Sequence, residues 1–105
     1  MVSRHWTGIA KKERAIEYIH HLKTDTFKQI EKIDGFISAK ILKREIDEGI
    51  EFLIITNWKN SEIIKQFAGE NFERAVVPEL VQDIMIRYDD KVRHYEVDYR
   101  TQIES

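Results

Sequence analysis

The sequence has 105 residues, which is enough for one domain spanning 1–105 and too few for two. Hydrophobic residues make up 42% and charged residues 34%, the balance of a folded globular chain. The net charge of −2 argues against nucleic acid or an anionic membrane as a partner, because both bind basic patches.

Cysteine is absent, which excludes disulfides, thiolate metal sites and a cysteine nucleophile. No apolar run approaches the roughly 18 residues of a membrane span. The opening residues 1–14 contain a Trp and a Gly where a secretory signal needs an apolar stretch. We therefore expect a cytoplasmic protein.

Residues 2–10 are rich in bulky and β-branched side chains and predict a first strand. From Lys11 onward the apolar residues recur every three or four positions, which predicts a helix of about six turns. Gly35 suits the left-handed cap that ends it. The apolar stripe of this helix is formed by Ile16, Ile19, Leu22 or Lys23, Thr26, Phe27, Ile30 and Ile33.

Two strands are expected next, at 36–46 and 50–58, joined by a tight turn at 47–49. The third strand is apolar on both of its faces, so both faces need cover. Its two sets of side chains are Phe52 and Ile54 on one face, and Leu53 and Ile55 on the other.

Residues 60–69 predict a short helix that Asn60 or Ser61 caps and Gly69 ends. Pro78 fits the first turn of another short helix. Residues 91–99 alternate and predict a fourth strand.

This order of elements is the ferredoxin-like β-α-β-β-α-β arrangement, an α+β fold with a four-stranded antiparallel sheet. Right-handed connections place strands one and three in the middle and both main helices on one face. The other face then has no cover from its own chain, and an exposed apolar face usually marks an interface. We therefore expect a homodimer with sheet against sheet.

The stretch VRHYEV at 92–97 holds a candidate catalytic pair, His94 and Glu96, at i, i+2 on one strand face. A carboxylate this close would raise the pKa of His94 and suit it to act as a general base. If the first and last strands are neighbours, His5 also approaches His94. The competing interpretation is a polar strand face on which Glu96 meets Arg4 across the ladder.

Several aromatic residues lie on elements that should converge between the sheet and the helices. Such residues either form core or line a pocket for a flat hydrophobic ligand. The candidate substrate-binding residues are His5, Trp6, Trp58, Phe67, Phe72 and Tyr95.

No metal site is expected. His20 and His21 are adjacent on a helix, so their side chains diverge by about 100° and do not hold one metal from one face. The sequence also lacks a glycine-rich phosphate loop, an HExxH motif and a hydrolase serine motif.

Residues 51–79 contain a strand ending in Trp, a small polar cap, a short helix carrying an aromatic residue, and then F-x-x-A. In this chain the pattern is formed by Trp58, Asn60 or Ser61, Phe67, and Phe72 to Ala75. This segment resembles the centre of the antibiotic biosynthesis monooxygenase superfamily of dimeric α+β barrels. RHWTG at 4–8 and HYEV at 94–97 resemble a subgroup of uncharacterised members of that superfamily.

The chain departs from the haem-degrading members of this superfamily. Val76 stands where they carry the iron-ligating His, Phe67 stands where they carry a second Trp, and the first strand lacks their Asn. The resemblance therefore implies a monooxygenase that needs no metal, haem or flavin cofactor and acts on a quinol-like or polyaromatic phenol. Such chemistry needs a base and a dry pocket. The alternative is a non-catalytic homodimer that binds a small hydrophobic or aromatic molecule or serves as a scaffold.

Overall fold

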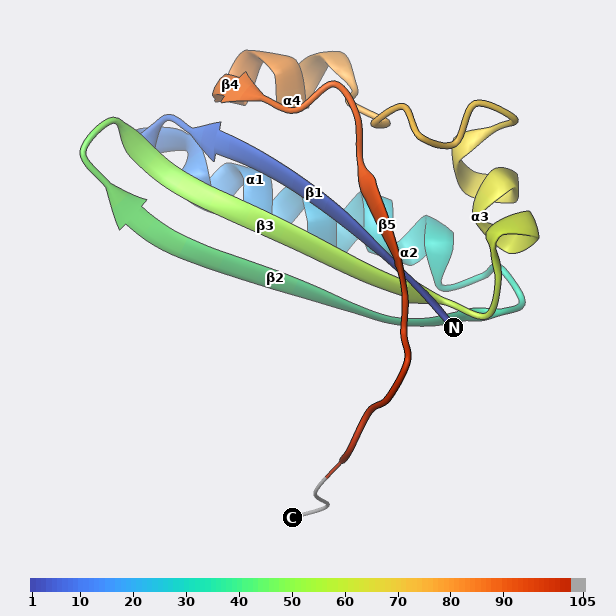
Figure 1. Cartoon of the computed structure of the whole chain (residues 1–105). Helices are drawn as coiled ribbons and strands as arrows, with labels where there is room; N and C mark the ends of the chain where they lie inside the picture. The colour runs from blue at the N-terminus through green and yellow to red at the C-terminus, as the bar shows by residue number, and fades with distance from the viewer. Residues whose placement is uncertain (103–105) are drawn as a thin grey trace.

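The computed structural model describes residues 1–102, in which a single antiparallel sheet is covered by helices on one face (Figure 1). The strands run in the order β2-β3-β1-β4, and β5 also pairs with β1. The strands are β1 (Val2–Ala10), β2 (Phe36–Ile46), β3 (Gly49–Trp58), β4 (Met85–Tyr88) and β5 (Arg93–Glu96). The expected α+β fold is confirmed, with β1 and β3 in the middle of the sheet.

The helical layer lies behind the sheet in Figure 1. Among residues 1–102, no helix is long and apolar enough to cross a membrane. The helices are η1 (Lys12–Arg14), α1 (Ala15–His21), the π-helical segment η2 (Leu22–Thr26), α2 (Phe27–Ile30), α3 (Ser61–Ala68) and α4 (Glu79–Ile84).

The first helical stretch contains a π-helical segment that periodicity did not predict. The π turn of η2 spaces hydrogen-bonded residues five apart instead of four, which shifts the inward face by one residue. The expected stripe is wrong at its start, because Ile16 is 82% exposed and Tyr18 is buried instead. Leu22 and Ile30 are buried as expected.

The predicted caps of α3 and the hairpin are confirmed. The Asn60 side chain accepts a hydrogen bond from the backbone N–H of Ile63. Gly69 is the C-cap of α3 and has positive φ, the conformation that ends a helix at low cost for glycine. Gly35 also has positive φ, but the expectation that it ends the first helix is wrong: α2 ends at Ile30 with Glu31 as its C-cap, and Gly35 lies in the turn before β2. Ile46 pairs with Gly49 across a two-residue loop.

The last strand differs from the expectation. Instead of one strand over 91–99, β4 pairs with the C-terminal part of β1 and β5 with its N-terminal part. The alternating pattern did not reveal β4, because Met85 is buried directly after α4 and continues the apolar side of that helix. A register shift between Ile9 and Ala10 accompanies the β4 pairing.

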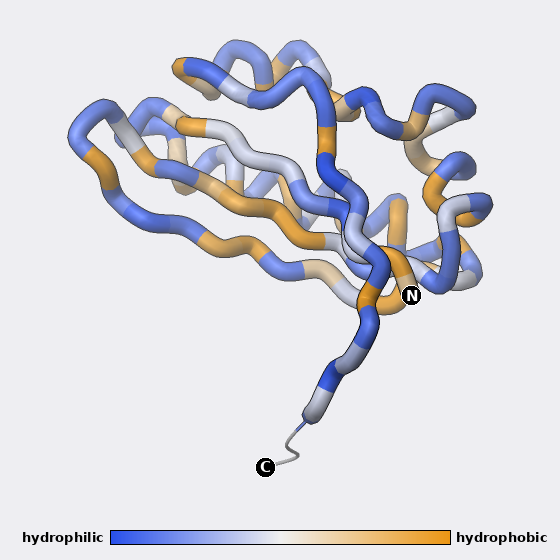
Figure 2. Tube along the Cα trace, in the orientation of Figure 1, coloured by the Kyte–Doolittle hydropathy of each residue, from blue (hydrophilic) through white to orange (hydrophobic). Residues whose placement is uncertain are grey.

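The core consists of two clusters on the helix side of the sheet. Tyr18 and Phe52 belong to the larger one, and Trp58 and Ile64 to the smaller one. Hydrophobic residues follow one another along β3, whereas hydrophilic residues interrupt them along β2 (Figure 2). The longest hydrophobic run of the two strands is therefore that of β3.

Within residues 1–102, no element covers the sheet face opposite the helices. Leu53 and Ile55 of β3 point to it and are half-buried. Leu42 of β2 and Tyr95 of β5 lie 45% and 50% exposed. We call this surface the open face.

Candidate functional site

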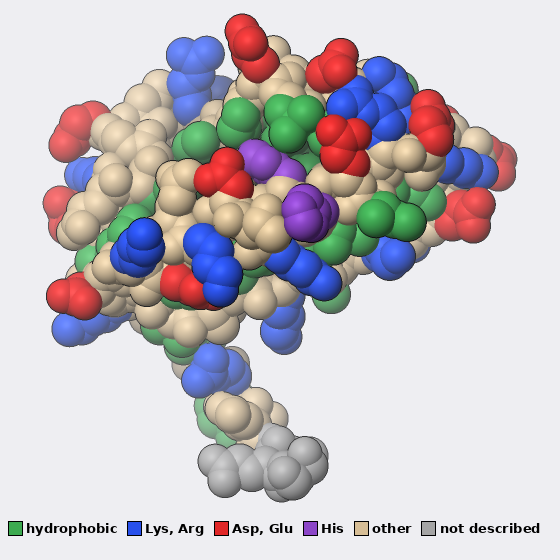
Figure 3. All heavy atoms as spheres, turned by 180° about the vertical axis from the view of Figure 1, so that it is seen from behind, with side chains coloured by type: hydrophobic (Ala, Val, Ile, Leu, Met, Phe, Trp, Pro, Cys, Tyr) green, Lys and Arg blue, Asp and Glu red, His purple; other side chains and the backbone are tan. Residues whose placement is uncertain are grey.

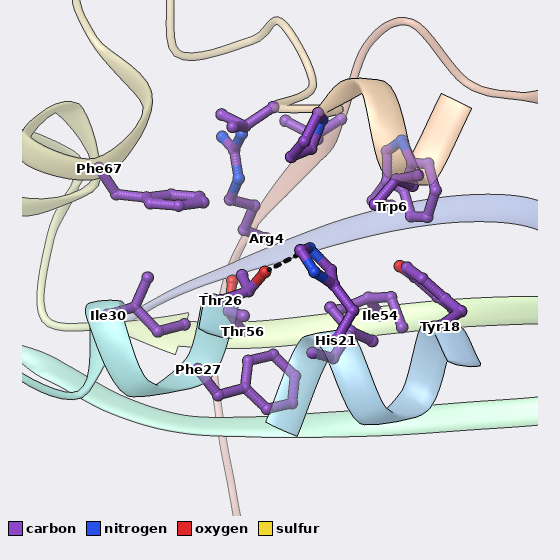
Figure 4. Close-up of a pocket in the computed structure, with 15 residues that line it drawn as sticks. Arg4, Trp6, Tyr18, His21, Thr26, Phe27, Ile30, Ile54, Thr56 and Phe67 are labelled. Carbon is purple, nitrogen blue, oxygen red and sulfur yellow. Dashed lines mark hydrogen bonds between the residues drawn. The ribbon is translucent and has the colours of Figure 1, made fainter. Parts of the chain in front are cut away.

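A cavity of about 80 Å³ lies between the sheet and the helical layer. β1 and β3 form one wall, and α1, η2 and α2 form the opposite wall (Figure 4). Val76 and Pro78, from the connection between α3 and α4, close a further side. Seen from the helix side, histidine side chains lie beside a band of hydrophobic side chains (Figure 3).

Arg4 is the cation of this cavity. It lies on β1, is only 5% exposed and borders the cavity space. Its Nη1 donates to the carbonyl of Phe72 at 2.5 Å and lies 3.0 Å from His94 Nε2, and its Nη2 donates to the carbonyl of Arg74 at 3.2 Å. The guanidinium also lies over the ring of Phe67, 5.8 Å from the centroid.

These partners of Arg4 are neutral groups. Among residues 1–102, no carboxylate forms an ion pair with Arg4. Burial lowers the pKa of Arg4 to about 10, so the guanidinium is still charged at neutral pH. The cavity therefore has a positive electrostatic character.

His21 presents an imidazole from the helix wall (Figure 4). Its Nε2 is 3.3 Å from the hydroxyl of Thr26, and its Nδ1 is 3.8 Å from a carboxylate oxygen of Asp25. The π turn brings His21 and Thr26, five residues apart, to the same wall. A proton on Nδ1 faces Asp25 and leaves Nε2 as an acceptor, which is the form of a general base.

Tyr18 contributes a buried hydroxyl. Its side chain is 2% exposed and its oxygen points toward the interior of the cavity (Figure 4). Among the described residues, every wholly buried side-chain nitrogen or oxygen has a hydrogen-bond partner. No hydrogen bond of the Tyr18 hydroxyl is found there, so this oxygen borders the cavity space. Burial raises the pKa of Tyr18, so it remains a neutral donor.

The remaining walls are apolar. Trp6 lies over Gly8, where an added Cβ would stand 2.6 Å from the indole ring. Its Nε1 donates to the carbonyl of Asp89, which holds the ring in place. Phe67 stacks on Trp58 with ring centroids 6.0 Å apart, and only Phe67 of the two borders the cavity.

The structure places the expected base, His94, next to the cavity but not on its wall. Arg4 is opposite His94 in the β1–β5 ladder and lies between it and the cavity. Burial and the charge of Arg4 lower the pKa of His94, whereas we expected Glu96 to raise it. Glu96 is exposed and is opposite Val2, so it does not meet Arg4 across the ladder as the competing interpretation held.

His5 and Tyr95 lie on the open face, away from the cavity. His5 is opposite Arg93, so His5 and His94 lie on opposite faces of the sheet. The expected approach of His5 to His94 is therefore wrong. The His5 Nε2 is 2.8 Å from the Ser3 hydroxyl, and its ring is 4.9 Å from that of Tyr95. Burial lowers the pKa of His5.

Trp58 and Phe72 do not line the cavity but contact residues that lie on or next to its wall. Trp58 is fully buried, and its Nε1 donates to the Thr56 hydroxyl. The Phe72 ring is 5.0 Å from that of His94, and the Phe72 carbonyl binds Arg4. Of the residues expected to bind substrate, Trp6 and Phe67 thus line the cavity.

Sequence reasoning missed Arg4, Tyr18, His21 and Thr26 as cavity residues. Alternation along β1 contained a signal for Arg4, since Arg4 shares a face with Trp6. Thr26 was on the expected inward stripe of the helix, but no pattern indicated His21, because its direction toward Thr26 depends on the π turn.

Comparisons with known proteins found solved structures with a similar fold. No family model and no curated protein matches the chain. A Bacillus cereus structure, provisionally named an antibiotic biosynthesis monooxygenase, is 20% identical with a TM-score of 0.69, and the match covers 100% of this chain and 98% of that one. A Deinococcus radiodurans structure with the same provisional name is 18% identical with a TM-score of 0.64, and the match covers 100% of both chains.

The heme-degrader MhuD of Mycobacterium tuberculosis, with two hemes bound in its active site, has a TM-score of 0.60 at 14% identity. That match covers 97% of this chain and 100% of MhuD. The chain thus has the fold of the antibiotic biosynthesis monooxygenases, as the resemblance implied.

A haem does not fit the cavity. Its volume of about 80 Å³ is far below the size of a tetrapyrrole. Val76 supplies no iron ligand, and the Nε2 of His21 is directed at Thr26. Among residues 1–102, no group of three or more His, Asp or Glu side chains could hold a metal ion.

Proposed function

We propose that this chain is a cofactor-independent monooxygenase that oxidises a quinol-like phenol in the cavity between sheet and helices. The observation that carries the proposal is an imidazole, His21, on the wall of a small apolar cavity that also holds a buried cation, Arg4. The shared fold with proteins provisionally named as monooxygenases supports it. The small volume favours quinol-like over polyaromatic substrates.

His21 acts as the base in this proposal. Its Nε2 accepts the phenol proton in place of its contact with Thr26, and the nearby carboxylate of Asp25 stabilises the resulting imidazolium. The positive charge of Arg4 makes the cavity favourable for an anionic bound molecule. The apolar rings of Trp6 and Phe67 exclude water from it.

The overall reaction needs no external reductant. A phenol with a free ring C–H and one O₂ yield a quinone and one water: one oxygen atom enters the ring, and the other leaves with two hydrogens of the substrate. All four electrons come from the substrate. The residues around the cavity are needed only to form the phenolate and to keep it dry beside oxygen.

His94 acts through Arg4. A neutral His94 accepts a hydrogen bond from Nη1 and, together with the Phe72 and Arg74 carbonyls, sets the position of the guanidinium. Glu96 has no contact with the cavity and assists neither group directly. His94 is therefore proposed as a positioning residue.

The assembly proposed is a homodimer through the open face. The apolar surface there is uncovered by any element of the described residues 1–102, and it is formed by Leu42, Leu53, Ile55 and Tyr95. A stable interface would bury roughly 1,200 Å² or more in total.

Oxygen uptake with a panel of hydroquinones and anthrones tests the proposal. His21→Gln should reduce turnover by about 10²-fold, the contribution typical of a general base, with little change in melting temperature. His20→Gln is the matched control, because His20 is the exposed neighbour on the same helix. Ligand binding without oxygen uptake for any substrate would favour the non-catalytic alternative.

A further inference from the structure

The charge on Arg4 has no counterpart in the described part of the chain. The guanidinium is 5% exposed, and all of its hydrogen-bond partners are neutral. A buried charge is costly unless an opposite charge is close. The surroundings of Arg4 therefore favour an anion supplied by a bound molecule.

The hydrogen bonds of Arg4 leave one part of the guanidinium free. An arginine has five N–H donors, and the contacts with Phe72, Arg74 and His94 use three of them. The remaining two are Nε–H and one N–H of Nη2, which belong to adjacent nitrogens. Two adjacent N–H groups form the fork that binds both oxygens of a carboxylate.

The Nε of Arg4 is not wholly buried. Among residues 1–102, wholly buried side-chain nitrogens all have partners, and none is found for Nε. Arg4 is also one of the residues that form the cavity wall. The free edge of the guanidinium is thus accessible to a molecule inside the cavity.

The charge and size of the cavity limit the anion. One cation neutralises a monoanion, and the nearby Phe72 and Arg74 carbonyls would repel a second negative charge. A volume of about 80 Å³ is about half of the roughly 150 Å³ cavity that holds benzene. A single ring therefore requires outward movement of a side chain such as Val76, which is 48% exposed, and fused rings do not fit.

A second polar group is available on the helix wall. The Tyr18 hydroxyl is buried and points toward the interior, and His21 lies on the same wall (Figure 4). Arg4 is on the sheet wall, across the cavity from both. A ring with an acidic group at one end and a hydroxyl at the other matches these two walls.

We infer that the substrate is a one-ring aromatic monocarboxylate with a phenol group, that is, a hydroxybenzoate-type acid whose carboxylate binds Arg4 and whose hydroxyl faces Tyr18 and His21. This inference rests on the proposed function for the reaction at the phenol. The binding of the carboxylate rests on Arg4 alone.

Calorimetry at pH 7.5 with the wild-type protein tests the charge requirement without any mutation. The probes are benzoate and 4-hydroxybenzoate, each compared with its neutral amide of the same shape. The carboxylates should bind at least about tenfold more tightly than the amides, and 4-hydroxybenzoate more tightly than benzoate. Equal affinity for acid and amide would overturn the inference.

Variants then locate the effect. Arg4→Met should abolish the preference for acid over amide, and Arg4→Lys should retain part of it. Arg74→Met is the matched control: it removes an exposed positive charge from the adjacent connection, and only the backbone carbonyl of Arg74 contacts Arg4. If Arg74→Met removed the preference for acid over amide and Arg4→Met left it unchanged, a direct contact between Arg4 and the carboxylate would be contradicted. Melting curves confirm that each variant is folded.

The proposed monooxygenase activity and the proposed substrate class can be refuted independently of each other. Tight carboxylate binding without oxygen uptake would sustain the substrate class and remove the oxygenase. Oxidation of neutral hydroquinones that 4-hydroxybenzoate does not inhibit would sustain the oxygenase and overturn the substrate class.

Discussion

The polar side chains on the two faces of β1 have different kinds of contacts. On the helix face, Arg4 is held by carbonyls from a connection some 70 residues away in sequence and by His94. On the open face, His5 pairs with its near neighbour Ser3 and the ring of Tyr95. Helices and the connection before α4 cover the helix face, whereas no element within residues 1–102 covers the open face. The cavity on the first face is therefore lined by residues of a single chain.

The largest effect expected from this contrast concerns stability. Phe52 and Leu53 are adjacent on β3, yet Phe52 is fully buried under the helices and Leu53 points to the open face. Phe52→Ala should destabilise the protein by about 3–5 kcal/mol, because it leaves a core cavity. Urea unfolding measures this.

Leu53→Ala is the comparison variant. At protein concentrations low enough to give the monomer, it should cost clearly less than Phe52→Ala. Equal costs there would show that the open face is as well packed as the helix face.

The second effect concerns association. Leu53→Lys places a charge in the centre of the proposed dimer contact and should weaken association by at least about 2 kcal/mol, the cost typical of losing an important interface residue. Sedimentation equilibrium measures the change. Glu31→Lys, an exposed change on the helix side, is the control and should leave association unchanged. A wild-type chain that stays monomeric at micromolar concentration would refute the dimer.

The smallest effect concerns pH. Burial lowers the pKa of both His94 and His5 below the ordinary 6.5. The unfolded chain then binds protons more readily than the folded one as the pH falls below about 6.5, so stability is present above that pH and is lost below it. Melting temperatures at pH 7.5 and 5.5 should differ less in His94→Gln than in the wild type.

The same measurement distinguishes the faces. For His94, the pH effect should not depend on protein concentration, because its surroundings come from one chain. For His5, the pH effect should depend on protein concentration if association buries the open face. His5→Gln should then remove the concentration-dependent part of the difference in melting temperature between pH 7.5 and 5.5. Identical behaviour of both variants at every concentration would remove this distinction.

Much of the architecture was determined by the sequence itself. The strand limits at 36–46, the cap at Asn60 and the helix end at Gly69 match the structure. These features depend on short-range interactions: side-chain alternation, a side chain bonding to a nearby backbone N–H, and the conformational freedom of glycine.

The tertiary structure alone decided the site. The register that sets Arg4 opposite His94, and so separates His94 from His5, depends on pairing between chain ends some 90 residues apart. The joint direction of His21 and Thr26 depends on a π turn, which apolar periodicity does not reveal. The burial of Arg4 requires the carbonyls of Phe72 and Arg74, contacts that no local pattern encodes. Local residue preferences therefore determined where strands and helices form, and long-range packing decided which side chains meet in the cavity.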